Sequence, residues 1–105
     1  MKVWNINDPK VPGDAVYIGR AGKGHDGRYG NPFRLGRHEP RGATLDRFKH
    51  WLWNNPEALR RTMELRDKDL VCFCKPAPCH GDVYVACLNA LTDAQIDARI
   101  KELEQ

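Results

Sequence analysis

The sequence predicts a small Rossmann-like α/β domain of two or three layers, with a short, mainly parallel sheet and about four helices. The main observation is that short apolar segments typical of strands alternate with longer segments of helical periodicity. Such alternation favours parallel strands joined by helical crossovers. A chain of 105 residues is long enough for one modest core, so residues 1–105 are expected to form a single domain.

The first half of the chain predicts two strands and a long loop. Residues 3–6 and 15–18 are short, apolar and β-branched, and each is followed by turn-forming residues. Residues 19–42 hold seven of the nine glycines and show no sustained periodicity. A loop of that length inside a compact domain is usually functional.

The second half predicts helices around a third strand. A helical pattern starts near Thr44, and Asn55 followed by Pro56 is typical of a cap and first turn of a second helix, which is expected to end near Arg66. Residues 69–73 form an apolar segment typical of a central parallel strand. Residues 83–91 continue in a largely buried helix, and Thr92 begins a capping box for a last helix.

Composition and charge narrow the range of functions. Residues 1–50 carry ten Lys and Arg against five Asp and Glu, with the excess densest between Arg20 and Arg41. This bias suits a phosphate-bearing partner. The chain has no serine, which excludes a serine hydrolase. With no apolar run of membrane-spanning length and no secretory signal at Met1, we expect a cytoplasmic protein without a membrane partner, whose four cysteines are thiols or metal ligands.

The segment that begins with Cys72 concentrates reactive groups at a predicted strand-to-helix junction. It reads Cys-Phe-Cys-Lys-Pro-Ala-Pro-Cys-His-Gly-Asp and ends at Asp82. A cysteine at a helix N-terminus has its thiolate stabilised by the helix dipole, so Cys79 is a candidate nucleophile. His80 is a candidate proton shuttle, and Asp82 could cap the helix, orient His80 or accept a hydrogen bond from a sugar hydroxyl.

Two other interpretations of this segment stay open. Cys72, Cys74, Cys79 and His80 have the right chemistry for zinc, but their spacing departs from the usual Cys-x2-Cys pattern. We therefore expect no cofactor, with zinc as the alternative. Cys72 and Cys87 also fit a purely structural role as small core residues.

The glycine-rich segment 19–33 directly follows a predicted strand, as a phosphate-binding loop would. It lacks the Gly-Lys-Ser/Thr end of a P-loop and the dinucleotide fingerprint. Because parallel strands can end side by side, this loop and the 74–82 turn are expected to line one crevice. The candidate ligand-binding residues are Gly19, Arg20, Gly30, Asn31 and Lys75, with Tyr29 or Phe33 available for stacking.

Three blocks, in order, resemble a family of small domains of unknown function, DUF4326, found in bacteria and phages. They are Val-Tyr-Ile-Gly-Arg ending at Arg20, Gly-Asn-Pro-Phe ending at Phe33, and the Cys-x-Cys-Lys-Pro…Cys-His-Gly-Asp block that ends at Asp82. The resemblance covers about residues 15–90. It implies an α/β fold and directs attention to Arg20, Asn31, Cys79, His80 and Asp82, but it supplies no substrate.

The expected function is binding of a nucleotide, nucleoside or other phosphorylated ligand in this crevice. If the protein is an enzyme, cleavage or transfer at a glycosidic or phosphate bond is the expected reaction. One alternative is a non-catalytic phage or bacterial accessory protein that sequesters a nucleotide or contacts a host protein. Another is a zinc-stabilised nucleic-acid-binding domain that uses the basic stretch from Arg20 to Arg41.

Overall fold

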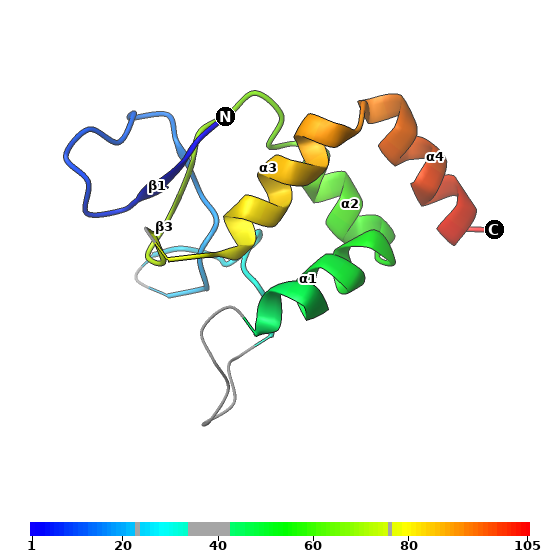
Figure 1. Cartoon of the computed structure of the whole chain (residues 1–105), viewed down its shortest axis with the longest axis horizontal. Helices are drawn as coiled ribbons and strands as arrows, with labels where there is room; N and C mark the ends of the chain where they lie inside the picture. Colours follow the sequence, from blue (N-terminus) through cyan, green and yellow to red (C-terminus); the bar gives the residue numbers. More distant parts are fainter. Residues whose placement is uncertain (23, 34–42, 76) are drawn as a thin grey trace.

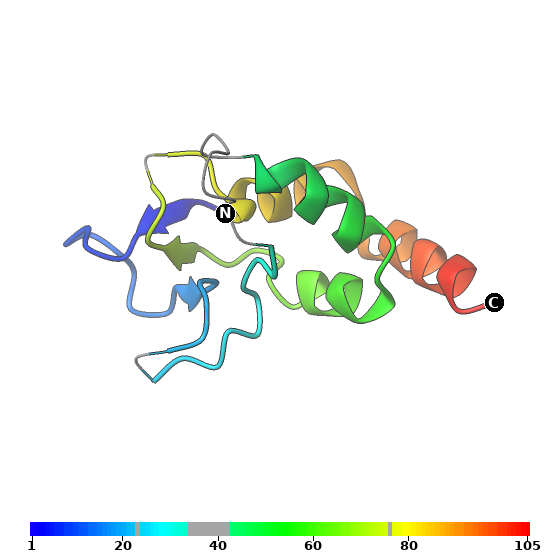
Figure 2. The ribbon, with the colours of Figure 1, turned by 90° about the horizontal axis from the view of Figure 1, so that it is seen from below.

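The computed structural model describes residues 1–22, 24–33, 43–75 and 77–105 of the chain. It has the predicted α/β architecture, with a three-stranded parallel sheet and four helices. The strands gather at one end of the molecule and the helices at the other, with α4 (Asp93–Leu103) farthest from the sheet (Figures 1 and 2). No helix in the described ranges combines the length and apolar character needed to cross a membrane.

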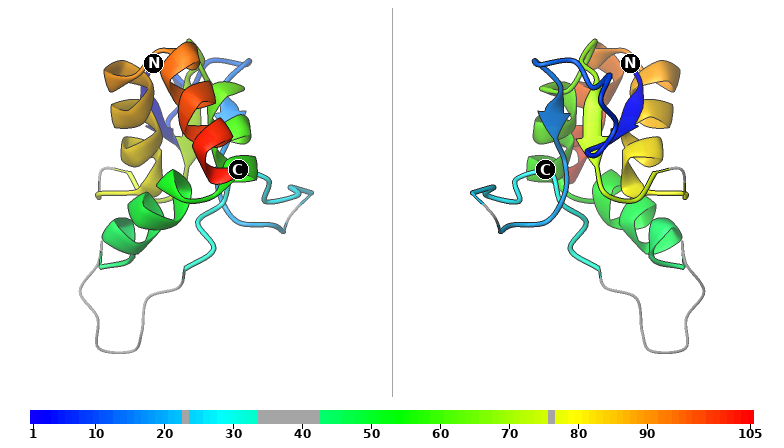
Figure 3. Two further views of the ribbon diagram at one scale, coloured as in Figure 1. Left: turned by 90° about the vertical axis from the view of Figure 1, so that its right-hand side faces the viewer. Right: turned by 90° about the vertical axis from the view of Figure 1, so that its left-hand side faces the viewer.

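The sheet has the strand order β1-β3-β2. β3 (Leu70–Cys72) lies between β1 (Val3–Asn5) and β2 (Val16–Tyr17) and pairs in parallel with both, as Figure 3 shows in its right-hand view. All three residues of β3 are buried, which confirms the prediction of an apolar central strand. All three strands are shorter than the sequence predicted, although the amides of Ile6 and Ile18, just past the outer strands, still bond to β3.

The helices begin close to where the sequence predicts. α1 (Thr44–Trp53) is followed by α2 (Pro56–Met63), whose cap Asn55 accepts a hydrogen bond from the amide of Ala58 at 3.1 Å. α3 (His80–Ala90) starts at the Cys/His segment. In the capping box of α4, Thr92 and Gln95 satisfy each other's backbone amides.

α2 ends about three residues earlier than predicted. The amides of Glu64, Leu65 and Arg66 bond to carbonyls three residues back, which tightens the chain into turns. Asp67 then takes a positive φ of 63°, a conformation that ends a helix. Leu65 is buried, as the apolar pattern up to Arg66 predicts, but it lies in a turn rather than in a helix.

The core lies where the helices meet the sheet. Fully buried side chains come from every layer: Ile18, Phe48, Leu59, Leu65, Leu70 and Ile96. Gly81, in the first turn of α3, sits against this core, because a Cβ there would lie 2.8 Å from Cδ1 of Ile18. Close packing at this point brings the start of α3 against the carboxyl end of β2.

Candidate functional site

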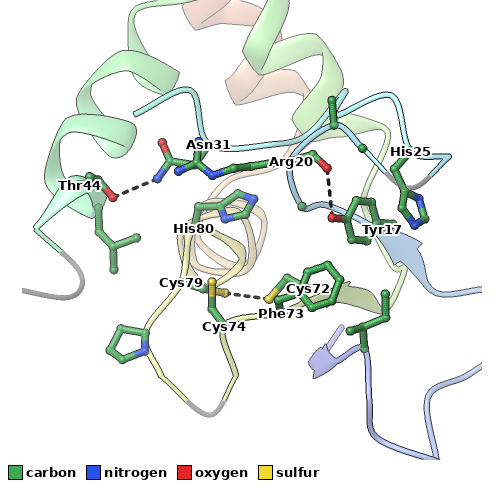
Figure 4. A pocket seen from close by; sticks show the side chains of 16 residues that line it. Tyr17, Arg20, His25, Asn31, Thr44, Cys72, Phe73, Cys74, Cys79 and His80 are labelled. Atoms are coloured by element: carbon green, nitrogen blue, oxygen red, sulfur yellow. Dashed lines mark hydrogen bonds between the residues drawn. The ribbon is translucent and has the colours of Figure 1, made fainter. Parts of the chain in front are cut away.

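A cavity of about 560 Å³ opens at the carboxyl ends of β2 and β3 (Figure 4). One wall comes from the loop after β2 and includes Gly19, Arg20 and Asn31. The opposite wall comes from the segment after β3 and includes Cys79 and His80. In open parallel sheets, ligands bind at this edge. The structure thus brings together two segments that lie about fifty residues apart in the sequence.

His80, at the first position of α3, is a buried wall of this cavity. Its Nε2 lies 2.6 Å from the carbonyl oxygen of Ile18 and 3.1 Å from that of Tyr29. A carbonyl oxygen only accepts, so Nε2 carries the hydrogen and donates. Burial lowers the pKa of His80 and outweighs these two carbonyl bonds. The ring is therefore neutral near pH 7, with its lone pair on Nδ1.

Cys72 and Cys79 form a thiol pair across the cavity floor, with Sγ atoms 3.4 Å apart. The hydrogen bond from Cys79 lowers the pKa of Cys72 to about 6, and backbone donors from Cys74 and Lys75 act in the same direction. The same contact, together with burial, raises the pKa of Cys79. The pair therefore shares one proton at neutral pH, and the lowered pKa of Cys72 favours the thiolate on that sulfur.

This assignment differs from the interpretation of the sequence, which placed the thiolate on Cys79. The dipole of α3 acts on Cys79, but the sulfur of Cys79 also lies 3.4 Å from that of Cys72, and either sulfur can be the donor. Two adjacent thiolates would repel, so only one is ionised. Cys72 gains the charge because several donors point to its sulfur. The contact between strand and helix was not visible in the sequence.

Arg20 and Asn31 frame the other side of the cavity. Nη2 of Arg20 donates to the carbonyl of Phe33 at 2.8 Å, which leaves most of its guanidinium donors for other partners. The side-chain amide of Asn31 donates to Oγ1 of Thr44 at 3.2 Å, and its oxygen accepts from the amide of Phe33. Asn31 thereby fixes the end of the loop against the start of α1.

An aromatic rim that the sequence interpretation missed borders the cavity. The rings of Tyr17 and His25 stack with centroids 3.8 Å apart, and Phe73 meets Tyr17 edge to face at 6.1 Å. Phe73 is 50% exposed. Tyr17 is the last residue of β2, and His25 exchanges backbone hydrogen bonds with Gly22. The two rings therefore stack only when the loop after β2 is folded. A flat aromatic group could stack on this rim.

Tyr29 and Phe33, the aromatics proposed for stacking, do not line this cavity. The hydroxyl of Tyr29 donates to Glu64 at 3.4 Å, and its carbonyl accepts from His80. Phe33 packs edge to face on Trp51 at 6.4 Å. Both rings anchor the loop to the helices instead.

Asp82 and Lys75 form an ion pair outside the cavity lining. Oδ1 of Asp82 lies 2.5 Å from Nζ of Lys75, and Oδ2 accepts from the amide of Cys79 at 3.1 Å. These contacts make Asp82 a helix cap, which is one of the roles the sequence allowed. Gly30 lies in a neighbouring cavity instead. These three residues were predicted as site residues, and none of them lines the main cavity, although Asp82 contacts Cys79 through its backbone amide.

The described residues do not support the zinc alternative with a set of ligands. No group of three or more His, Cys, Asp and Glu side chains is arranged there to hold a metal ion. In the proposed set, Nε2 of His80 donates to two carbonyls, so Nδ1 is the nitrogen of His80 that keeps a lone pair. Part of the basic stretch invoked for nucleic acid, residues 34–42, lies outside the described residues.

Comparison with known proteins gives one finding. The family model described as Domain of unknown function (DUF4326) matches residues 4–90. No curated protein and no solved structure matches the chain. The matched range includes β1 to α3 and therefore every residue of the cavity described above.

Proposed function

Because the chain belongs to the DUF4326 family, whose description supplies no ligand, we propose a function from the cavity itself: it binds a nucleoside or nucleotide. The observation that carries the proposal is the pairing of an aromatic rim with a guanidinium in one cavity of about 560 Å³. That volume suits a small organic ligand. The rim offers a base a stacking surface, and Arg20 offers donors to a polar or anionic group.

Binding without turnover is the form of this function that the geometry favours. Catalysis at a glycosidic or phosphate bond needs a group that donates or accepts a proton at the bond. Asp82 faces Lys75, and the Nε2 hydrogen of His80 is held by two carbonyls. Asp82 is thus held in a structural contact, and His80 can accept a proton only at Nδ1, which supports a binding module.

Enzymatic cleavage or transfer is the second candidate, and the Cys72 thiolate supports it. A thiolate that lines a cavity is a nucleophile at neutral pH. The sulfur of Cys72 would form a bond to the sugar carbon or the phosphorus of the ligand. The bond from that atom to the leaving group would break, and the leaving group would depart with its electron pair. Mass spectrometry of the protein after incubation with the ligand would detect the covalent adduct that this step requires.

Calorimetry tests the proposal with a panel of nucleosides, nucleoside monophosphates and nucleoside diphosphates. We expect at least one class to bind the wild-type protein, and Arg20→Gln and Tyr17→Ala each to weaken it by about tenfold. Arg60→Gln is the control, because Arg60 pairs with Glu57 and Glu104 away from the cavity. Chromatography of the same mixtures separates the two candidates: binding without product favours the binding module.

The proposal fails if no member of the panel binds. It also fails if Arg20→Gln and Tyr17→Ala bind the ligand as tightly as the wild-type protein does. In that event the accessory-protein interpretation, with contact to another protein, would become the leading one.

A further inference from the structure

A second cavity, of about 410 Å³, adjoins the first. Arg20, Ala21 and Asn31 line both, so these residues form the partition between them. The second cavity is also lined by Arg28 and Arg61. A ligand with groups in both cavities would therefore lie against Arg20.

Arg61 is a residue of this cavity with an unsatisfied hydrogen-bond donor. It lies in the last turn of α2 and is half-buried. Its Nε is buried and has no hydrogen-bond partner among the described residues. A buried donor without an acceptor costs about 1 to 3 kcal/mol, and such groups in native structures usually meet a water, an ion or a ligand.

The charges around Arg61 favour an anion. Arg28 is already neutralised by Glu64, whose two carboxylate oxygens lie 2.5 and 2.8 Å from its Nη2. Among the described residues, the carboxylate that lines the cavity is Asp26, which accepts from the amide of Arg28 at 3.0 Å and offsets one of the two other arginine charges. Arg20 and Arg61 therefore leave the second cavity with a net positive charge.

The kind of anion follows from the donors. A guanidinium presents paired N–H groups that match two oxygens of a phosphate, and Arg61 lines this cavity although its Nε is itself buried. Arg20 donates to the carbonyl of Phe33 through one nitrogen and has further donors beside both cavities. A phosphate in the second cavity would lie within the region that these two arginines border.

We propose that the second cavity binds the phosphate of the ligand whose base and sugar occupy the first, and that Arg61 holds it. This inference rests on the proposed function and narrows it, because it makes the ligand a nucleotide rather than a nucleoside. Arg61 is then a binding residue that the sequence interpretation did not select. Gly30, which it did select, lines this second cavity, and a Cβ there would lie 3.0 Å from the carbonyl oxygen of Gly19.

The test compares each nucleoside 5′-monophosphate with its parent nucleoside by calorimetry, in wild-type protein, Arg61→Gln, Arg61→Lys and Arg60→Gln. The wild type should bind the monophosphate at least about tenfold more tightly than the nucleoside. Arg61→Gln should remove that difference and leave nucleoside affinity unchanged, while Arg61→Lys should keep part of it. Arg60→Gln, one residue away and paired elsewhere, should behave as wild type.

Inorganic pyrophosphate provides a probe that does not depend on the first cavity. In ¹⁵N-resolved NMR, we expect it to shift the Nε–H resonance of Arg61 in wild type and Arg60→Gln. Thermal melting of each variant shows whether it is folded, and Arg61→Lys tests the site if Arg61→Gln does not fold.

The possible outcomes distinguish the phosphate site from the proposed binding of a nucleoside or nucleotide. Equal affinities for monophosphate and nucleoside would overturn the phosphate site while the proposed function stands. Pyrophosphate binding at Arg61 with no binding of nucleosides or nucleotides would support the anion site and overturn the nucleotide as its ligand. If pyrophosphate, the nucleosides and the nucleotides all fail to bind, both proposals are wrong.

Discussion

The sulfur atoms of Cys72 and Cys79 lie 3.4 Å apart, one at the end of the central strand and the other at the cap of α3. This contact joins the two elements that hold the candidate site. It also sets the ionisation of the pair, since a thiol that donates to its neighbour stabilises a thiolate there. The ionisation of this pair is thus a product of tertiary structure, and Cys72 itself is 1% exposed.

Cys72 should be alkylated by iodoacetamide at a rate that rises with pH around a midpoint near 6, because its pKa is lowered to about 6. The thiolate is the reactive form, so the rate increases as pH rises and then levels off. Cys79→Ala removes the donor and should move the midpoint upward, toward that of an ordinary thiol. Peptide mapping by mass spectrometry measures the rate at each cysteine.

Cys87→Ala is the control for this experiment. Cys87 lies farther along α3, where burial raises its pKa. The Cys87→Ala substitution should therefore leave the pH midpoint of Cys72 alkylation unchanged. A wild-type midpoint near that of a free thiol would contradict the shared-proton arrangement.

His80 should make the protein less stable in acid. Its pKa is lowered by burial, so the unfolded state binds the proton more readily than the folded state. Stability from this group is complete above the ordinary histidine pKa of about 6.5 and is lost as pH falls through the lower folded value. Urea unfolding of His80→Gln at a series of pH values should therefore show a weaker loss in acid than wild type.

The same substitution has an effect at neutral pH. Loss of the imidazole contacts with Ile18 and Tyr29 should lower the free energy of unfolding by about 1 to 3 kcal/mol. His50→Gln, on the exposed face of α1, should change neither quantity. An acid response of His80→Gln identical to that of wild type would argue that another group controls it.

Asp82→Asn should weaken the fold without weakening ligand binding. It removes the negative charge paired with Lys75 and disturbs the cap at Cys79, and a lost cap costs about 0.5 to 2 kcal/mol. Asp82 does not line either proposed ligand cavity, so affinity in calorimetry should match that of wild type. A large loss of affinity in a folded Asp82→Asn protein would restore the catalytic or binding role that the sequence suggested.

The parts of the fold that were predictable from the sequence are those set by local chemistry. Asn55 before Pro56, and Thr92 three residues before Gln95, are capping signals that act within one turn. The central strand was recognisable because all its residues are apolar. The end of α2 was missed because Asp67 takes a positive φ, which residue types other than glycine adopt infrequently.

The candidate site was predictable in outline and not in detail. A loop and a turn that follow neighbouring parallel strands must reach the same edge of the sheet, which brought Arg20 and Cys79 to one cavity. The partners of each side chain depend on contacts between distant segments. No pattern around His80 indicates the carbonyls of Ile18 and Tyr29, and no pattern around Arg61 indicates its buried Nε.

Gly27→Ala should destabilise the loop that separates the two cavities. Gly27 has a φ of +72°, and a Cβ there would lie 2.7 Å from the backbone nitrogen of Ala21. Strain at such a position costs about 1 to 3 kcal/mol, and here backbone rather than a flexible side chain opposes the new atom. Urea unfolding should show that loss, and calorimetry should show weaker nucleotide binding, since Gly27 lines the second cavity. Gly13→Ala is the matched control, because a Cβ at Gly13 meets nothing within 4 Å. Equal stability of the two variants would mean that the loop relaxes around the added methyl group without loss of its contacts.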